Sequence, residues 1–157
     1  MIFISKYGNK IQIKPEVVTG LLKYKQVTES NLEAGGILIG RFLSESDDVI
    51  IDNYTKPSCY DTQKRYFFKR LTKVHQDILN EIWKKSNGTQ NYLGEWHTHP
   101  ENVPFPSNHD FNSWHVLLKN QNDDIKRLYF IILGIKEIKI WEGFTHNFEI
   151  NEMKLVK

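Results

Sequence analysis

The sequence predicts an α+β domain in which a mixed, largely antiparallel central sheet is flanked by helices. Short apolar runs of strand length recur along the chain, and two longer segments repeat their apolar residues every three or four positions. These segments do not alternate as a regular strand-helix-strand repeat, which argues against a doubly wound parallel sheet. Because no internal repeat or linker is visible, we expect a single domain spanning residues 1–157.

Strands are expected where a short run of residues is apolar, or alternates apolar with polar, between turn residues. Alternating residues on either side of Gly8 and Asn9 indicate a hairpin or two short strands near the N-terminus. Two apolar runs joined by the polar turn 44–48 predict a central hairpin. The expected strands are Ile2–Ile4, the segment around Ile11 and Ile13, Gly36–Leu43, Val49–Tyr54, Tyr92–Trp96, Arg127–Ile135, Glu137–Trp141 and Phe148–Ile150.

Three helices are expected between these strands. The first begins at Pro15, whose ring suits the first helical position, and its apolar spacing lasts until the polar residues at Thr28. The second covers Leu71–Trp83, where apolar residues recur at helical steps until Asn87-Gly88 supplies a stop. The third covers Ser107–Asn120.

The stretch Lys56–Lys69 follows no regular period, so we expect a mobile loop that ends in a short strand at Tyr66–Phe68. The only cysteine, Cys59, lies in this stretch. A single cysteine excludes an intramolecular disulfide, and the first residues lack the pattern of a signal peptide, so a reducing cytoplasm fits best. No activating motif surrounds Cys59, which we therefore interpret as incidental.

The charges favour neither nucleic acid nor a membrane as partner. The chain has 21 basic and 19 acidic residues scattered along its length, so its formal net charge of +2 creates no concentrated positive field for a phosphate backbone. The longest apolar run, Leu128–Ile135, is far shorter than the roughly 20 residues that a membrane-spanning helix needs.

One segment carries histidine and aspartate residues at a spacing that suits a metal site. Alternate side chains of an extended strand share a face, so His97 and His99 can present two imidazole nitrogens to one ion. Pro100 ends the strand, and the proline-rich loop after it is long enough to bring the next helix back beside the histidines. Ser107 and Asp110 share one face of that helix, so Asp110 can supply an oxygen ligand. Two histidines and one aspartate leave the fourth position of a catalytic zinc ion for water.

A water activated in this way also needs a proton acceptor. Glu33 is a candidate because it lies just before Ala34-Gly35-Gly36, at the entry to the strand Gly36–Leu43. The glycines allow close approach of the backbone there.

The whole pattern resembles the JAMM (JAB/MPN+) metalloprotease motif. Glu33 precedes Gly-Ile-Leu-Ile-Gly, and His97-Thr98-His99-Pro100 is followed at family spacing by Ser107 and Asp110. The resemblance implies a JAB/MPN, cytidine-deaminase-like fold with Zn²⁺ held by His97, His99 and Asp110. It also implies that Glu33 is the general base and acid, and that Ser107 steadies the oxyanion. Members typically cleave isopeptide or peptide bonds after the C-terminal tail of ubiquitin or a ubiquitin-like protein.

The flanking residues resemble a narrower, bacterial JAB-domain subgroup associated with anti-phage CBASS operons. They are Gly94-Glu95-Trp96 before the histidines, Pro104-Phe105-Pro106 before Ser107, and Trp114. The resemblance implies an isopeptidase that releases a CD-NTase (a cGAS-like nucleotidyltransferase) from targets joined to its C-terminal tail, with an E1/E2-like conjugating enzyme in the same system. A processing peptidase for a bacterial ubiquitin-like or sulfur-carrier protein is the alternative.

Simpler interpretations exist for the individual residues. A His-x-His pair alone is weak evidence for a metal, and Glu33 alone would be a surface carboxylate in most proteins. Ser107 and Asp110 also fit the capped N-terminus of a helix, a role compatible with catalysis.

The remaining histidines are not ligand candidates. His109, beside Asp110, is interpreted as a partly exposed helix residue, and His75 as a hydrogen-bonded packing residue. His115 and His146 have no partner visible in the sequence.

Two other classes of function remain open. One is a metal-free scaffold or binding module, which would be expected to lack the glutamate, histidines or aspartate of the motif, whereas this chain keeps them all. The other is a small-molecule hydrolase such as a deaminase, whose usual His-x-Glu or paired-cysteine ligands are missing. For a peptidase, an extended tail would add a strand to a sheet edge. Glu101–Phe105 and Lys56–Lys64 are the expected walls of that binding site.

Overall fold

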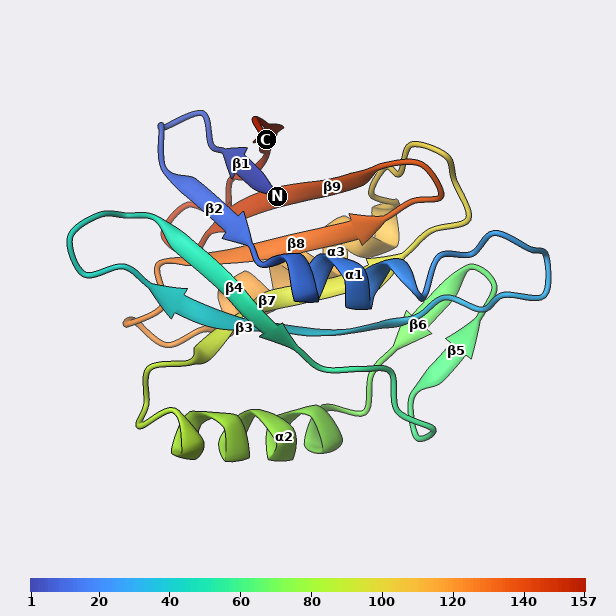
Figure 1. Cartoon of the computed structure of the whole chain (residues 1–157), viewed down its shortest axis with the longest axis horizontal. Helices are drawn as coiled ribbons and strands as arrows, with labels where there is room; N and C mark the ends of the chain where they lie inside the picture. Colours follow the sequence, from blue (N-terminus) through green and yellow to red (C-terminus); the bar gives the residue numbers. More distant parts are fainter.

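The computed structural model describes residues 1–157 and has the predicted α+β architecture. Nine strands form one sheet in the order β10-β9-β8-β7-β3-β4-β2-β1-β11, and β5 pairs with β6 in a separate hairpin (Figure 1). Neighbouring strands of the sheet are antiparallel except for the β2/β4 and β7/β8 pairs. The elements are β1 (Ile2–Ile4), β2 (Lys10–Ile13), α1 (Pro15–Leu22), β3 (Gly35–Phe42), β4 (Val49–Tyr54), β5 (Thr62–Lys64), β6 (Phe67–Lys69), α2 (Thr72–Lys85), β7 (Asn91–Thr98), α3 (Asn108–Lys119), β8 (Arg127–Leu133), β9 (Ile138–Phe144), β10 (Ile150–Glu152) and β11 (Lys154–Leu155).

The two faces of the sheet are covered by different helices, with α1 in front and α3 behind in Figure 1. Successive residues of β8 point to opposite faces, so Ile131 packs in the core that holds Leu21 of α1, whereas Ile132 packs in the core that holds Trp114 of α3. The ring of Trp114 stacks on Phe130 with centroids 4.6 Å apart. Strong burial of β8 on both faces explains why its sequence is an unbroken apolar run.

A bulge in β7 determines which side chains face α3. Leu38 pairs with Gly94 and Ile39 with Tyr92, so Leu93 is skipped in the ladder to β3. Gly94 has φ +140°, and a Cβ there would lie 1.9 Å from the carbonyl oxygen of Tyr129. Only glycine fits this position. After the bulge, the odd-numbered residues of β7 face α3, which is the face that carries the functional site.

The β5–β6 hairpin lies against the beginning of β3. A Cβ at Gly35 would come within 2.5 Å of the ring of Phe68, so the missing side chain makes room for the hairpin. At the base of the hairpin, a carboxylate oxygen of Asp61 accepts a hydrogen bond from the Leu71 amide. The same carboxylate contacts Nε2 of the buried His75, 3.0 Å away.

The fold class is confirmed, and several boundaries differ from the prediction. The first helix ends at Leu22 instead of continuing toward Thr28, because the chain turns to bury Gln26, which accepts a hydrogen bond from Thr98 Oγ1. The last predicted strand lies slightly later, at Ile150–Glu152, and β11 follows it. None of the three helices combines the length and apolar character that crossing a bilayer requires.

The stretch expected to be a loop contains a hairpin. Lys56–Lys69 holds both β5 and β6, where only one short strand was predicted. Its strands are three residues long and carry polar residues, so no periodic signal marks them in the sequence. Contacts to residues distant in sequence hold them in place.

Candidate active site

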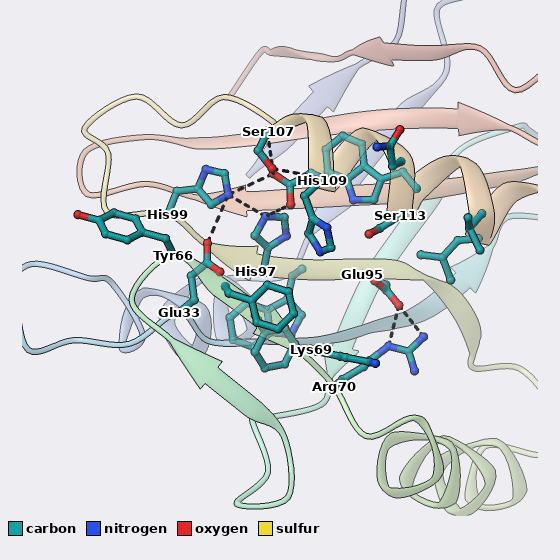
Figure 2. Close-up of a pocket in the computed structure, with 18 of the residues that line it drawn as sticks. Glu33, Tyr66, Lys69, Arg70, Glu95, His97, His99, Ser107, His109 and Ser113 are labelled. Carbon is teal, nitrogen blue, oxygen red and sulfur yellow. Dashed lines mark hydrogen bonds and ion pairs between the residues drawn. The ribbon is translucent and has the colours of Figure 1, made fainter.

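The two histidines of β7 and the first turn of α3 meet at one point (Figure 2). Nε2 of His97 lies 3.0 Å from Nε2 of His99. The Asp110 carboxylate reaches both rings, with Oδ1 3.2 Å from His97 Nε2 and Oδ2 3.3 Å from His99 Nε2. The structure therefore brings together the three residues that the sequence predicts as ligands.

The spacing of these atoms fits a small tetrahedral ion. Ligand atoms about 2.0–2.2 Å from a tetrahedral zinc lie about 3.3–3.6 Å from one another. The two nitrogens lie 3.0 Å apart, and one lies 3.2 Å from Oδ1 and the other 3.3 Å from Oδ2 of Asp110, which is close to this range. Nitrogen and carboxylate oxygen are also the donors that zinc accepts. His97, His99 and Asp110 could thus hold a metal ion.

Glu33 offers an alternative third donor. Its carboxylate and the nitrogens of His97 and His99 all lie within 4.8 Å of one another. The Glu33 Oε1 atom is 3.5 Å from His99 Nε2, whereas Asp110 approaches both histidines more closely. Asp110 is therefore the better third ligand, and Glu33 lies beside the ligand group with a free carboxylate.

Ser107 and Asp110 form a capping box at the start of α3. The backbone amide and the hydroxyl of Ser107 both donate to Asp110 Oδ2 at 2.7 Å, and the Asp110 amide donates back to Ser107 Oγ at 3.1 Å. This reciprocal pairing satisfies free amides at the helix end and fixes the orientation of the Asp110 carboxylate. The helix-capping role expected for Ser107 and Asp110 is therefore confirmed. The cap also orients the Asp110 carboxylate toward the histidines.

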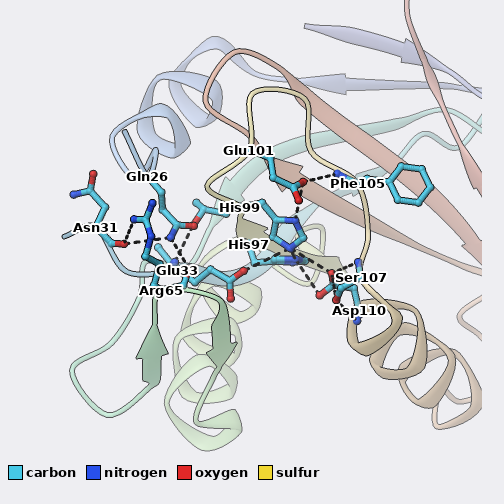
Figure 3. Close-up of polar contacts among 12 residues, drawn as sticks. Gln26, Asn31, Glu33, Arg65, His97, His99, Glu101, Phe105, Ser107 and Asp110 are labelled. Atoms are coloured by element: carbon cyan, nitrogen blue, oxygen red, sulfur yellow. Dashed lines mark hydrogen bonds and ion pairs between the residues drawn. The ribbon is translucent and has the colours of Figure 1, made fainter. Parts of the chain in front are cut away.

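The carboxylate of Glu33 points toward His99 (Figure 3), and the backbone of Glu33 is held on both sides. Its amide donates to the carbonyl oxygen of Lys64 at 2.8 Å, and its carbonyl accepts from the side chain of Gln63 at 2.9 Å. The next amide, Ala34, donates to Thr98 Oγ1 at the end of β7. The β5–β6 hairpin and the sheet together therefore set the position of this carboxylate.

Burial changes the protonation behaviour of the two carboxylates in opposite directions. Desolvation raises the pKa of Glu33 to about 8, although the neighbouring His99 opposes the change. Burial also acts to raise the pKa of Asp110, but hydrogen bonds from His97 and His99 outweigh it and hold that pKa well below its usual value. Asp110 therefore stays ionised, as a ligand must, while Glu33 can exchange a proton near neutral pH.

The site opens into a cavity of about 810 Å³ between α3 and the hairpin. Its floor is β7, one wall is α3, and the other wall is the segment Tyr66–Thr72. Of the walls expected from sequence, Glu101 borders the cavity, whereas Lys56–Lys64 does not line it. In that segment Gln63 and Lys64 instead contact the backbone of Glu33, and Asp61 is engaged at the hairpin base.

Sequence reasoning missed three functional candidates in this cavity. Arg70 and Glu95 form an ion pair at its far end, and His109 lines it with its ring 5.4 Å from the ring of Phe67. The sequence could have indicated Glu95 as a cavity residue, because it lies two residues before His97 and so on the same face of the strand. No pattern in the sequence indicates Arg70, because its position depends on how the hairpin packs.

The other residues singled out in the sequence lie elsewhere. His75 is fully buried between Thr55 Oγ1, at 2.6 Å, and Asp61, so its predicted packing role is confirmed. Cys59 is an exposed free cysteine. His115 contacts the carbonyl oxygen of Phe111 one helical turn earlier.

Comparison with known proteins identifies first the fold and then the family. The solution structure of protein DSY2949 from Desulfitobacterium hafniense has a TM-score of 0.63 at 19% identity, over 93% of this chain and 91% of that one, and so shares the fold. Residues 16–143 match the model described as prokaryotic homologs of the JAB domain, and the chain belongs to this family.

Curated relatives agree with this assignment. A protein of Escherichia coli (strain TW11681) is 34% identical over 98% of this chain and 94% of its own length. One of Vibrio cholerae serotype O1 is 34% identical over 91% and 86%, and one of Pseudomonas aeruginosa is 36% identical over 70% and 68%. Each is named "CD-NTase/cGAS isopeptidase". These names imply a hydrolase, and they match the subgroup that the flanking motif resembles.

Proposed function

We propose that this chain is a zinc-dependent isopeptidase that cleaves the bond after the extended C-terminal tail of a protein. The observation that carries the proposal is the meeting of His97, His99 and Asp110 within 3.0–3.3 Å, with the buried carboxylate of Glu33 beside them. Three ligands next to a free carboxylate are the parts that metal-assisted hydrolysis needs.

His97, His99 and Asp110 would hold the zinc ion, which would supply Lewis-acid activation of the scissile carbonyl and of the attacking water. Glu33 takes the proton that this water loses and passes it to the leaving amine as the C–N bond breaks. Burial of Glu33 beside His99 places this carboxylate where it can exchange that proton.

Ser107 stands where it can donate a hydrogen bond to the oxygen that becomes negative during the reaction. Its hydroxyl lines the cavity and donates to Asp110 Oδ2 in the structure. A rotation about one side-chain bond redirects that hydrogen, while the backbone amide of Ser107 keeps its own bond to Asp110.

The substrate tail is proposed to lie along β6. This strand pairs only with β5, so its other edge is unpaired, and Phe67–Lys69 line the cavity. An extended tail can add a strand at such an edge and point its last carbonyl toward His97. The names of the relatives support a CD-NTase as the owner of the tail. An E1/E2-like conjugating enzyme as the maker of the bond is implied only by the resemblance of the sequence motif.

The test combines zinc content with cleavage of a defined substrate. Purified protein would be analysed for zinc and incubated with a CD-NTase whose C-terminal tail is joined to a reporter protein. We expect about one zinc per chain, release of the reporter after the last tail residue, loss of activity on chelation, and recovery on adding zinc. Cleavage that survives complete removal of metal would refute the zinc mechanism. A zinc-loaded protein that leaves every tail fusion intact would refute the isopeptidase assignment.

A further inference from the structure

The end of the cavity away from Glu33 carries a partly shielded ion pair. The Arg70 Nε atom lies 2.6 Å from Glu95 Oε1, and Nη2 lies 2.5 Å from the same oxygen. The side chains of Arg70 and Glu95 are only 17% and 22% exposed. Because both residues line the cavity, the pair faces the space that we assign to the tail.

The position of this pair relative to the metal ligands follows from strand geometry. Glu95 and His97 are alternate residues of β7, so both face the cavity and are separated by about 6.6 Å, twice the rise per residue. Figure 2 shows Glu33 and His99 at one end of the cavity and Arg70 with Glu95 at the other. An extended tail with its last carbonyl at His97 therefore places its third-from-last residue beside Arg70 and Glu95.

The charges at this end of the cavity are unequal. Lys69 and Arg70 contribute two positive charges against the single carboxylate of Glu95, and Ser113 of α3, which lies at the same end, is neutral. Nε and Nη2 of Arg70 both contact Glu95 Oε1, and the side chain of Tyr92 lies beside the same guanidinium. A planar guanidinium in this arrangement suits a second carboxylate.

We propose that Lys69, Arg70 and Glu95 form a specificity subsite for an acidic residue, aspartate or glutamate, at the third-from-last position of the substrate tail. This inference rests on the proposed function. Glu95 orients the guanidinium of Arg70, and Arg70 with Lys69 binds the acidic side chain. A basic residue at the same position meets two like charges and is disfavoured.

The first experiment varies the substrate. Tail fusions that differ only at the third-from-last residue, carrying Asp, Asn, Ala or Lys, would be compared by kcat/KM with the unaltered enzyme. We expect the Asp tail to exceed the Lys tail by at least about tenfold, with Asn and Ala between them. Equal rates for the four tails, or a preference for Lys, would overturn the subsite while leaving the isopeptidase assignment intact. If no tail is cleaved, the proposed function fails and the subsite fails with it.

The second experiment changes the net charge of the subsite in opposite directions with two variants of the enzyme. Arg70→Gln leaves only Lys69 against the carboxylate of Glu95, so the preference for the Asp tail over the Lys tail should be lost. Glu95→Gln frees Arg70, so the preference for the Asp tail should persist or increase. Loss of structure lowers the rate for every tail together and cannot change the preference in opposite directions in the two variants. If Arg70→Gln fails to fold, Glu95→Gln and the tail series still decide the question.

Matched controls come from an exposed ion pair on α2. Lys73 Nζ lies 2.9 Å from Asp77 Oδ2, with the side chains 81% and 60% exposed. Lys73→Gln and Asp77→Asn repeat the two charge changes outside the cavity and should leave the ranking of tails unaltered. Binding of the uncleaved Asp and Lys tails to the Glu33→Gln protein gives a readout that does not depend on turnover. A ranking that changes equally in the α2 controls would overturn the subsite in favour of a long-range effect of net charge.

Discussion

The two sides of the cavity are built in different ways. On one side, β7 and the first turn of α3 belong to the main sheet and its helical cover, and they hold His97, His99 and Asp110. On the other side, the β5–β6 hairpin has only three residues in each strand and rests on the sheet through Gly35 and the backbone of Glu33. The residues proposed to carry out the reaction are therefore held by the core, whereas the proposed contact with the tail comes from an attached hairpin.

The largest expected effect is on the sheet side. His97→Ala removes one of three ligands, so zinc affinity should fall by more than about 100-fold, beyond the loss of an outer contact, and cleavage should cease. Zinc titration measures the affinity for the metal, and circular dichroism measures whether the secondary structure is kept. We expect the secondary structure to remain, because His97 contributes no apolar packing to either core. A globally unfolded variant would contradict a catalytic role and indicate a structural metal site.

The next largest effect is a loss of stability at the bulge that determines which side chains of β7 face α3. Gly94→Ala introduces a side chain at φ +140° with its Cβ 1.9 Å from the Tyr129 carbonyl oxygen, and should lower the free energy of unfolding by about 2–5 kcal/mol. Gly8→Ala is the control, because Gly8 also has positive φ, +92°, but its Cβ would meet nothing within 4 Å. Chemical denaturation measures both. Equal losses would show that backbone strain alone, not close packing of the bulge, explains the glycine.

The capping box separates stability from chemistry at Ser107. Ser107→Ala should cost about 1 kcal/mol of stability by removing the cap, whereas Ser107→Gly, which caps nearly as well, should cost a few tenths. Both variants lose the hydroxyl, so both should lower kcat by about 10²–10³-fold if it stabilises the oxyanion. Thermal unfolding and steady-state kinetics make the comparison. If kcat falls only in the alanine variant, which is also the less stable one, the role of Ser107 is limited to capping the helix.

The smallest effect is expected on the hairpin side. Phe68→Ala removes the ring that rests on Gly35, so the hairpin should bind the tail less tightly and KM should rise by about tenfold with a smaller change in kcat. Phe42→Ala, at an exposed residue of β3, is the control and should change neither constant. A fall in kcat with unchanged KM would show that the hairpin acts on Glu33 more than on the tail.

The sequence predicted the sheet side well because local rules govern it. Strand alternation placed His97 and His99 together, and the i, i+3 spacing of Ser107 and Asp110 matched a helix cap that the structure contains. Glu33 was found through the family motif, because its burial depends on segments far along the chain. Its position beside the histidines confirms the geometry, while its catalytic role remains a prediction.

The hairpin side could not be predicted by the same rules. Its strands are short and irregular, and they are fixed by single contacts such as Asp61 to the Leu71 amide and Gln63 to the Glu33 carbonyl. Contacts of this kind leave no period in the sequence. For that reason the sequence did not indicate that Tyr66–Thr72, and not Lys56–Lys64, would line the cavity, and Arg70 was overlooked.

Glu33→Gln tests the central claim most directly, because glutamine keeps the shape of the side chain and loses its ability to take a proton. Zinc content and cleavage of the tail fusion would be measured on the same sample, with Glu29→Gln as an exposed control on the same segment. We expect zinc to stay at about one per chain while turnover falls by about 10²–10⁴-fold or more. Turnover close to that of the unaltered protein, or loss of zinc together with activity, would contradict the assignment of Glu33 as the group that handles the proton.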